Sequence, residues 1–444
     1  MEKKHLFSLR NLPIGKILLL FLLIYIALLA IPYIRHKKVS ASYQNEFARR
    51  SFYSDTAGTE RVAYINDNTD ALLYRLHMLD EAKDEIILST FDFNADKSGQ
   101  DMMASLLHAA DRGVSVRIYN PINLLKPWNL QARMHDKYVI VDQKMYLLGG
   151  RNTTNLFLGD YSKSKNIDRE LFVYETAEND SSSILQLTDY FESVWSLSDS
   201  KEYRCKKMTK KIQDCKTKLE NRYASLKEKY PDAYSTWDYE TLTLQTNKVS
   251  LLSNPIESAN KEPWMWHSLH QLMMQGEQVH IYTPYIICGK EMYQDLTALH
   301  EKKIPVEIIT NDVASGANPW GCTDYLNQKK NIWETGARVY EFMGEHSCHT
   351  KAVLIDDRMS IVGSYNMDMR STYQDTELML AVDCPELNSI IKDEMKRDKT
   401  YSKTMGSDGE YDYGENYHSK DLSFGKQVFY AVLRVITIPP RRFL

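Results

Sequence analysis

Apolar and polar residues follow the same order in two long stretches of the chain. Residues 62–93 predict a short strand, an amphipathic helix with apolar residues at helical spacing, and a β-branched strand at 86–91. Residues 249–285 predict the same series and end in a strand at 279–285. Each series continues into a further helix and a further strand. Strands that alternate with helices predict an α/β fold with largely parallel or mixed sheets.

A polar motif also occurs twice. In "RMHDKYVIVDQKMYLLGGRN", residues 133–152, it consists of His135, Lys137, Asp142 and Gly149. In "SCHTKAVLIDDRMSIVGSYN", residues 347–366, the same steps are repeated by His349, Lys351, Asp356 and Gly363. One copy alone is equally well explained by a buried strand with polar residues at its ends. Two copies at identical spacing favour two pseudo-symmetric α/β/α halves that pack together and form one site.

The two halves differ in length before the motif. There are 44 positions from Phe91 to His135, but 64 from Tyr285 to His349. We therefore expect the first half to lack one helix and one strand that the second half has. The predicted organisation is an N-terminal anchor at 1–40, a first half at 60–198, a charged helical insertion at 199–247, a second half at 248–400 and a C-terminal tail at 401–444.

The N-terminal anchor is predicted from an uncharged apolar run. Residues 17–34 contain 18 positions without a charge, close to the ~20 residues that cross a hydrocarbon core. A secretory signal is the competing interpretation, but the run is longer than a usual signal core and no clear cleavage site follows it. We expect an uncleaved transmembrane helix that makes the protein single-pass in a cell membrane. Basic residues flank both ends of this run, so the positive-inside rule does not decide on which side of the membrane the catalytic domain lies.

Two further segments carry alternative interpretations. The insertion should be helical from about Lys201 to Lys229 and is rich in basic residues near its start. Such a helix can bind anionic lipid headgroups or can simply present a solvated face. The C-terminal tail alternates apolar and basic residues before Pro439 and Pro440, which end any helix there. It can lie in a membrane interface or dock against the domain.

Composition excludes some classes of protein. The chain of 444 residues is 43% hydrophobic and 26% charged, and its net charge is −4. A nucleic-acid-binding chain would be strongly basic, so we expect no nucleic acid partner. The six cysteines are too sparse for a disulfide framework and lack the spacing of metal ligands.

The repeated motif suits the chemistry of a phosphodiester. Alternate side chains of a strand share a face, so His135 lies beside Lys137, and His349 beside Lys351. Two such strands brought together would direct two imidazoles and two ammonium groups at one pocket. One histidine can attack phosphorus to give a covalent intermediate, and the other can protonate the leaving alcohol and then deprotonate the incoming one. This scheme needs no metal and no cofactor.

Other polar residues near the motifs are expected to support these groups. The lysines, turn amides and three substrate-binding side chains would stabilise the phosphate oxyanion. These three side chains are Asn152, Ser364 and Asn366. A carboxylate bonded to the far nitrogen of each histidine would hold its tautomer, and Asp168 and Glu377, each at the start of a strand downstream of its histidine, are the candidates, with Glu170 as a rival to Asp168.

The motif aspartates complete the predicted catalytic set. This set comprises His135, Lys137, Asp142, His349, Lys351 and Asp356. Within it we prefer a structural role for Asp142 and Asp356, as residues that tie the strand end through buried hydrogen bonds or an ion pair. Their apolar neighbours Val141 and Ile355 suggest that they are buried. Further on, "DRELFVYE" from Asp168 and "DTELMLAVD" from Asp375 both read as an acidic residue that leads into a strand.

The pattern H-x-K-x4-D-x6-G-[GS]-x-N, present twice, resembles the phospholipase D superfamily. Within it, residues 60–395 are similar to bacterial cardiolipin synthases, notably at "LLGGRN", "IVGSYNMDMRS" and "TGARVYEF". The resemblance implies a site between two α/β halves, a phosphohistidine intermediate on His135 and acid–base catalysis by His349. It extends to Lys137, Lys351, Asn152 and Asn366. The compact first half and the single anchor depart from the family pattern.

Together these features predict a membrane-anchored phosphatidyltransferase of cardiolipin synthase type. Its substrates would be phospholipids, phosphatidylglycerol or a similar lipid as donor. The alternatives are a hydrolytic phospholipase D, another phosphodiesterase such as a nuclease, and a tethered scaffold without catalysis. The second lipid substrate and the oligomeric state stay open.

Overall fold

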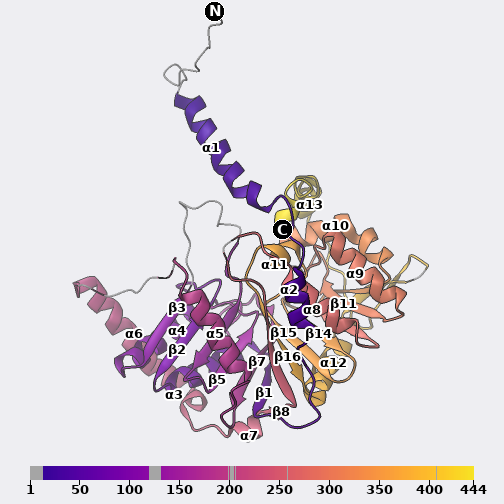
Figure 1. Ribbon diagram of the computed structural model, residues 1–444. Coiled ribbons are helices and arrows are strands. Elements are labelled where there is room, and N and C mark those ends of the chain that lie inside the picture. The colour runs from indigo at the N-terminus through magenta and orange to yellow at the C-terminus, as the bar shows by residue number, and fades with distance from the viewer. Residues whose placement is uncertain are drawn as a thin grey trace, which may run out of the picture.

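The computed structural model describes residues 14–119, 132–198, 200, 205, 207–257, 259–406 and 408–444. Two α/β halves lie side by side, and the N-terminal helix projects away from them (Figure 1). The predicted start of the helical insertion at Lys201 lies outside the described residues, and so do the basic residues Lys3, Lys4, Arg10, Arg204 and Lys206.

The first half is built on a seven-stranded mixed sheet with the order β3-β2-β4-β5-β7-β1-β8. Only β2 and β3 are parallel among these pairs. The elements are β1 (Glu60–Ile65), α3 (Asn68–Glu81), β2 (Glu85–Ser89), α4 (Lys97–Asp111), β3 (Ser115–Tyr119), β4 (Lys137–Val141), β5 (Met145–Gly149), β6 (Asn166–Ile167), β7 (Glu170–Glu175) and α5 (Ser183–Trp195). The predicted series of strand and helix at 62–93 is therefore present as β1, α3 and β2.

The second half repeats this plan on a nine-stranded sheet with the order β18-β17-β12-β11-β10-β14-β15-β16-β9. Its elements are β9 (Lys248–Ser253), α8 (Trp264–Met273), β10 (Val279–Tyr282), α9 (Lys290–Glu301), β11 (Val306–Asn311), α10 (Pro319–Glu334), β12 (Arg338–Phe342), β13 (Ser347–Cys348), β14 (Ala352–Ile355), β15 (Met359–Gly363), α11 (Met369–Tyr373), β16 (Leu378–Asp383) and α12 (Pro385–Thr400). The predicted mixed α/β architecture of both halves is confirmed.

The predicted difference between the halves corresponds to α10 and β12. These two elements follow β11 and extend the second sheet on the far side of β11. In the first half, β3 ends at Tyr119 and β4 begins at Lys137. Residues 120–131 between them lie outside the described residues, so the lack of a helix and a strand there stays a prediction.

The sheet of the second half continues into the C-terminal segment. There β17 (Ser402–Met405) pairs with β12, and β18 (Tyr411–Tyr413) pairs with β17. The helix α13 (Phe424–Ile436) follows, and Figure 1 shows it near the base of α1, beside the C-terminus.

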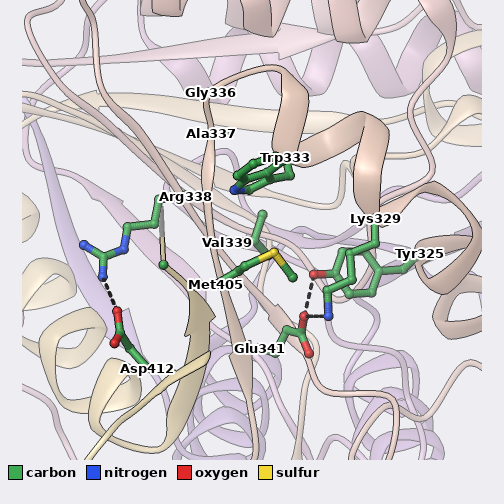
Figure 2. Close-up of a pocket in the computed structure, with 11 residues that line it drawn as sticks. Tyr325, Lys329, Trp333, Gly336, Ala337, Arg338, Val339, Glu341, Met405 and Asp412 are labelled. Atoms are coloured by element: carbon green, nitrogen blue, oxygen red, sulfur yellow. Dashed lines mark hydrogen bonds and ion pairs between the residues drawn. The ribbon is translucent and has the colours of Figure 1, made fainter. Parts of the chain in front are cut away.

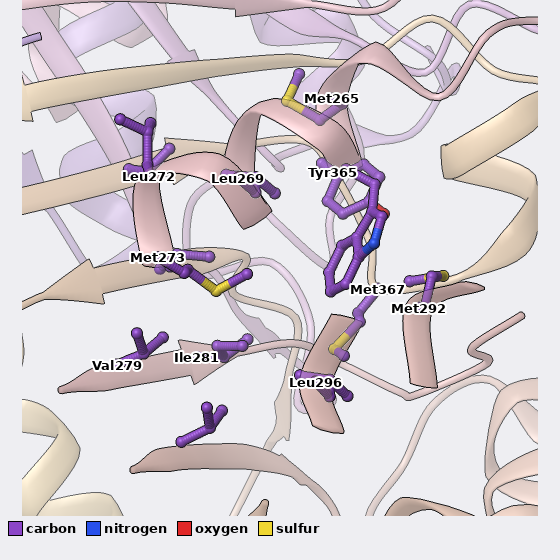
Figure 3. Packing of buried hydrophobic residues seen from close by; sticks show 14 of the residues in the cluster. Met265, Leu269, Leu272, Met273, Val279, Ile281, Met292, Leu296, Tyr365 and Met367 are labelled. Carbon is purple, nitrogen blue, oxygen red and sulfur yellow. The ribbon is translucent and has the colours of Figure 1, made fainter. Parts of the chain in front are cut away.

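Buried apolar residues pack between the two halves and beneath the helices on their outer faces. One cluster contains residues of both sheets, for example Ile140 and Leu171 from the first and Leu354 and Leu380 from the second, so the sheets share a central core. Helices α3 and α4 bury a second cluster against the outer face of the first sheet. A third lies under α8 and α9 in the second half, where Leu269, Leu272 and Met273 pack against β10 (Figure 3).

The charged insertion packs on the first half. Its helix α6 (Lys210–Lys229) lies against α4, and Arg222 bonds to the buried carboxylate of Asp101 at 2.6 Å. The short α7 (Tyr239–Leu242) then leads to β8 (Leu244–Gln245), which pairs with β1. The helix thus ends where the sequence predicted, while residues 207–209 before it are not helical.

One described helix is long and apolar enough to cross a membrane. Residues Ile14–Tyr33 comprise α1 (Ile14–Ala30) and one 3-10 turn, and their mean hydropathy is 2.8. No residue of α1 is buried against the protein, whereas Tyr33 in the turn is buried. At about 1.5 Å per residue this segment is about 30 Å long, the thickness of a hydrocarbon core. A short helix, α2 (Ala41–Phe47), then packs Tyr43 and Phe47 into the core of the second half.

Candidate active site

Backbone pairing between the halves positions both motif histidines. His135 comes two residues before β4, and Met134 forms a parallel bridge to Thr376 of the second half. Equivalently, His349 follows β13, whose Cys348 pairs with Ile167 of the first half. The amide of His135 donates to the carbonyl of Thr376 at 3.2 Å, and that of His349 to Ile167 at 2.6 Å. Each histidine is therefore held by the opposite half.

The carboxylates that orient the imidazoles also come from the opposite half. His135 Nδ1 lies 2.8 Å from Glu377 Oε1, and His349 Nδ1 lies 2.6 Å from Asp168 Oδ2. The sequence singled out both acids but assigned each to the histidine of its own half, and that assignment is wrong. The parallel bridges explain the exchange. They bring the start of β7 beside His349 and the start of β16 beside His135.

The strand register also corrects the alignment of the two acidic segments. Gly149 pairs with Glu170, two positions after Asp168, whereas Gly363 pairs with Met379, two positions after Glu377. Asp168 is thus the structural equivalent of Glu377, not of Asp375. The rival Glu170 is excluded from the site, since it is buried in ion pairs with Arg75 and Arg151.

Two buried lysines lie beside the histidines. Lys351 Nζ is 2.6 Å from His349 Nδ1, 3.1 Å from His349 Nε2 and 3.9 Å from Asp168 Oδ2. Lys137 Nζ donates to the carbonyl of His135. Burial lowers the pKa of Lys351, and burial together with the charge of Lys351 lowers the pKa of Lys137 to about 8. Because the charge of one lysine acts on the other across the interface, the two motifs converge on one region.

The pKa of each imidazole is lowered, which favours the neutral ring. Burial and the ammonium of Lys351 lower the pKa of His349 to about 4, and burial and Lys137 hold the pKa of His135 well below its usual value. With Nδ1 facing a carboxylate, the proton of a neutral ring resides on Nδ1 and Nε2 carries the lone pair. Each ring is therefore oriented with Nε2 as its nucleophilic or basic atom.

The two carboxylates differ in their electrostatic environment. Burial raises the pKa of Glu377 to about 7. Burial acts in the same direction on Asp168, but the charge of Lys351 and the hydrogen bond with His349 outweigh it and lower the pKa of Asp168. Glu377, which faces His135, is therefore easily protonated, whereas Asp168, which faces His349, stays ionised.

The three predicted substrate-binding residues have different surroundings. Ser364 is fully buried and its hydroxyl donates to Glu377, so it supports that carboxylate and is not placed to contact a substrate. The equivalent position is Gly150, where a Cβ would lie 2.5 Å from Asp168 Oδ2. Asn152 bonds to Asp92, whereas the amide oxygen of Asn366 is buried without a hydrogen-bond partner. Asn366 therefore has free hydrogen-bonding capacity.

The motif aspartates lie at the opposite end of their strands and are not part of the candidate catalytic centre. Asp142 follows β4 and accepts hydrogen bonds from the amides of residues 83–85 at 2.8–2.9 Å. Asp356 follows β14 and accepts from Glu277 and Gln278 at 2.8 and 3.0 Å. Both have positive φ, at 51° and 53°, a conformation that aspartate tolerates in tight turns. They are partly exposed, so the expectation of burial is wrong, whereas their hydrogen bonds agree with the structural role preferred from the sequence.

We predict that Asp142→Ala lowers the free energy of unfolding by about 1–3 kcal/mol, because three backbone amides lose their acceptor. Asp142→Asn, which keeps one acceptor oxygen and tolerates the same turn, should lose less. Urea unfolding followed by circular dichroism measures both variants. A large loss of turnover in Asp142→Ala without a loss of stability would restore Asp142 to the catalytic set.

Several residues at the site were not singled out from the sequence. Arg133 stacks on Phe91, with the guanidinium 4.3 Å from the ring centre, and Phe91 in turn contacts the ring of His135 edge-on. Arg370 forms an ion pair with Asp375 at 3.0 Å, and the charge of Arg370 acts on His135. Phe157 packs edge-on against His349. For Arg133, one signal was present in the sequence, its position two residues before His135.

A separate pocket of about 530 Å³ lies in the second half, between the end of α10 and β12. Tyr325, Lys329, Trp333 and Glu341 are among the residues that line it, and its charged groups are paired with each other (Figure 2). It contains no residue of the predicted site.

The chain is similar to known proteins in sequence and in fold. Residues 269–399 match a family model described as "Cardiolipin synthase, PLD-like domain". Cardiolipin synthase C of Escherichia coli is 23% identical over 74% of this chain and 82% of its own length. An uncharacterized protein of Helicobacter pylori is 24% identical over 75% of this chain and 78% of its own length. The crystal structure of phosphatidylserine synthase from Haemophilus influenzae superposes with a TM-score of 0.61 at 14% identity, covering 91% of this chain and 99% of that one, which shows a shared fold. The predicted resemblance to the phospholipase D superfamily, and to cardiolipin synthases within it, is confirmed.

Proposed function

We propose that this phospholipase D-like chain is a membrane-anchored phosphatidyltransferase of cardiolipin synthase type. It would transfer a phosphatidyl group from one phospholipid to the free hydroxyl of another. The observation that carries the proposal is the pair of neutral histidines, each oriented by a buried carboxylate of the opposite half. The apolar segment Ile14–Tyr33 supports a single-pass anchor that keeps the enzyme at its lipid substrates.

In the first step, His135 Nε2 attacks the phosphorus of the donor lipid. A nitrogen–phosphorus bond forms and the bond from phosphorus to the headgroup oxygen breaks. Glu377 keeps the proton of His135 on Nδ1 and stabilises the positive charge that develops on the ring. Its pKa of about 7 means that this carboxyl can also take up that proton during attack.

The leaving headgroup oxygen receives its proton from His349. In the protein without substrate this ring is neutral, since its pKa is about 4. An anionic phosphodiester beside the ring raises the pKa, because opposite charge favours the protonated form. Ionised Asp168 acts in the same direction from the other side of the ring. Substrate binding thus loads His349 with the proton that it delivers.

In the second step, neutral His349 removes the proton from the incoming alcohol. The alcohol oxygen attacks phosphorus, the nitrogen–phosphorus bond breaks, and His135 is regenerated. Lys137 and Lys351 neutralise the phosphoryl oxygens in both steps. Arg133 and Arg370 are further cations near His135 that attract anionic lipid headgroups.

A product assay tests this proposal. Purified full-length protein incubated with phosphatidylglycerol in mixed micelles should produce cardiolipin and glycerol, measured by lipid mass spectrometry. Phosphatidic acid as the main product would indicate that the protein is a hydrolase and not a transferase. Cleavage of plasmid DNA would indicate a nuclease. A His135→Ala preparation is the control for contaminating activity. Absence of every product from well-folded protein would contradict the proposal.

A further inference from the structure

The helix α13 near the C-terminus carries an apolar face that the protein leaves uncovered. Phe424, Val432 and Val435 are 80%, 54% and 69% exposed. Val428, Phe429 and Ile436 on the same helix are exposed as well. Successive positions are four, one, three, three and one residues apart, so they lie on one side of the helix.

The opposite side of α13 is fixed to the protein. Leu433 and Thr437 are buried, and the helix packs against α10. Asn327 of α10 donates to the carbonyl of Arg434 at 2.9 Å, and Arg434 Nε donates back to the Asn327 side chain at 2.8 Å. Arg441, after the helix, pairs with Asp324 of α10 at 2.8 Å. The helix is therefore docked in a defined orientation with its apolar face outward.

This face adjoins the point where the apolar segment Ile14–Tyr33 meets the protein. Arg442 donates to the carbonyl of Ile34, directly after that segment. In Figure 1, α13 lies near the base of α1 and is seen nearly end-on, whereas α1 extends away from the protein. If α1 stands across a bilayer, α13 lies along its surface.

The charges around this junction complement a phospholipid surface. Arg35, Lys37 and Lys38 are exposed just after the apolar segment, and Lys426 and Arg434 are exposed on α13. Basic residues of this kind are attracted to anionic headgroups, by about 1 kcal/mol for each charge near the surface. An outward apolar face flanked by basic residues is the composition of a helix that lies in a membrane interface.

We propose that α13 is a second membrane contact, with its apolar face immersed in the interface of the bilayer that α1 enters. The inference rests on α1 as the membrane span and does not depend on phosphatidyl transfer. After α13 the chain returns to the candidate site: the amide of Arg370 donates to the carbonyl of Leu444 at 3.0 Å, and Gln374 donates to that of Arg442 at 3.0 Å. Immersion of α13 thus holds the α11 side of the catalytic centre close to the lipid surface.

Spin labelling of full-length protein in phospholipid vesicles tests this contact. The exposed Cys205 and Cys215 are replaced by serine, and the other four cysteines are buried. Single cysteines are then introduced as Val432→Cys or Val428→Cys on α13, Leu22→Cys in α1, and Ile212→Cys on α6 as an exposed apolar control far from α1. His135→Ala in every protein keeps the lipid composition constant. Accessibility to oxygen and to a water-soluble nickel complex reports the depth of each label.

The α13 labels should be accessible to oxygen and protected from nickel, at a depth of about 5–10 Å. The Ile212 label should be accessible to nickel. Nickel accessibility of both α13 labels equal to that of Ile212 would overturn the proposal. Protection from nickel and oxygen alike would indicate a protein partner on this face and would also overturn it. A Leu22 label that is accessible to nickel would show that α1 does not span the bilayer, and the proposal for α13 would then lose its premise.

Discussion

Replacement of His135 by alanine is expected to lower turnover by about 10⁴-fold or more, because the reaction loses the atom that forms the covalent intermediate. His349→Ala should have an effect of similar size with a lipid headgroup as leaving group, since neither the leaving nor the incoming oxygen then has a proton carrier. Mass spectrometry of the lipid products measures both variants against the unmodified protein.

The double variant should be no worse than either single variant. Residues that act in one reaction sequence are not additive, because loss of one already blocks the common path. Thermal unfolding of each variant should stay near that of the unmodified protein, since both side chains are partly accessible and not in the apolar core. Retention of a tenth of the activity in either single variant would contradict a site shared by the two motifs.

Glu377→Gln and Asp168→Asn should each reduce turnover by about 10²- to 10⁴-fold, the contribution of a positioned proton-transfer group. The amide can donate to Nδ1, so the ring proton moves to Nε2 and the reactive lone pair is lost. Shape and volume are nearly unchanged, which keeps the packing intact. Glu386→Gln, an exposed change at the start of α12, is the matched control and should retain full activity.

The exchange of carboxylates between the halves can be tested with an activated substrate. A phosphodiester with a nitrophenolate leaving group needs no general acid in the first step. Asp168→Asn, which disturbs His349, should then still release one equivalent of nitrophenol in a burst. Glu377→Gln, which disturbs His135, should lose the burst together with the turnover. The reverse result would mean that His349 is the nucleophile, and equal loss of the burst in both variants would contradict separate roles for the two histidines.

Much of the fold follows from local patterns. The strands β2 and β10 and the helices that precede them are read from apolar spacing, because the 3.6-residue and two-residue periods depend on the chain's own geometry. The histidines and lysines are likewise found from their spacing, which places each pair on one face at the end of a strand. A count of residues also predicts that the first half lacks one helix and one strand of the second half.

The support of the site depends on contacts that no local pattern contains. Asp168 and Glu377 were found, but not which histidine each one orients, because that depends on the parallel bridges between Met134 and Thr376 and between Cys348 and Ile167. The apparent match of Asp168 with Asp375 failed because the strand register pairs Gly149 with Glu170 but Gly363 with Met379. The hydroxyl of Ser364 donates a hydrogen bond to Glu377. Both side chains are buried, so this hydroxyl is not available to a substrate.

The sequence by itself determined the duplicated α/β halves, the apolar segment near the N-terminus and the four histidine and lysine side chains of the motif. The tertiary structure alone decided that each histidine is oriented from the opposite half, that Asp142 and Asp356 hold turns away from the site, and that α13 presents its apolar face beside α1. The physical reason is that periodicity and spacing are properties of neighbouring residues, whereas hydrogen-bond partners and exposed faces arise only when distant segments pack together.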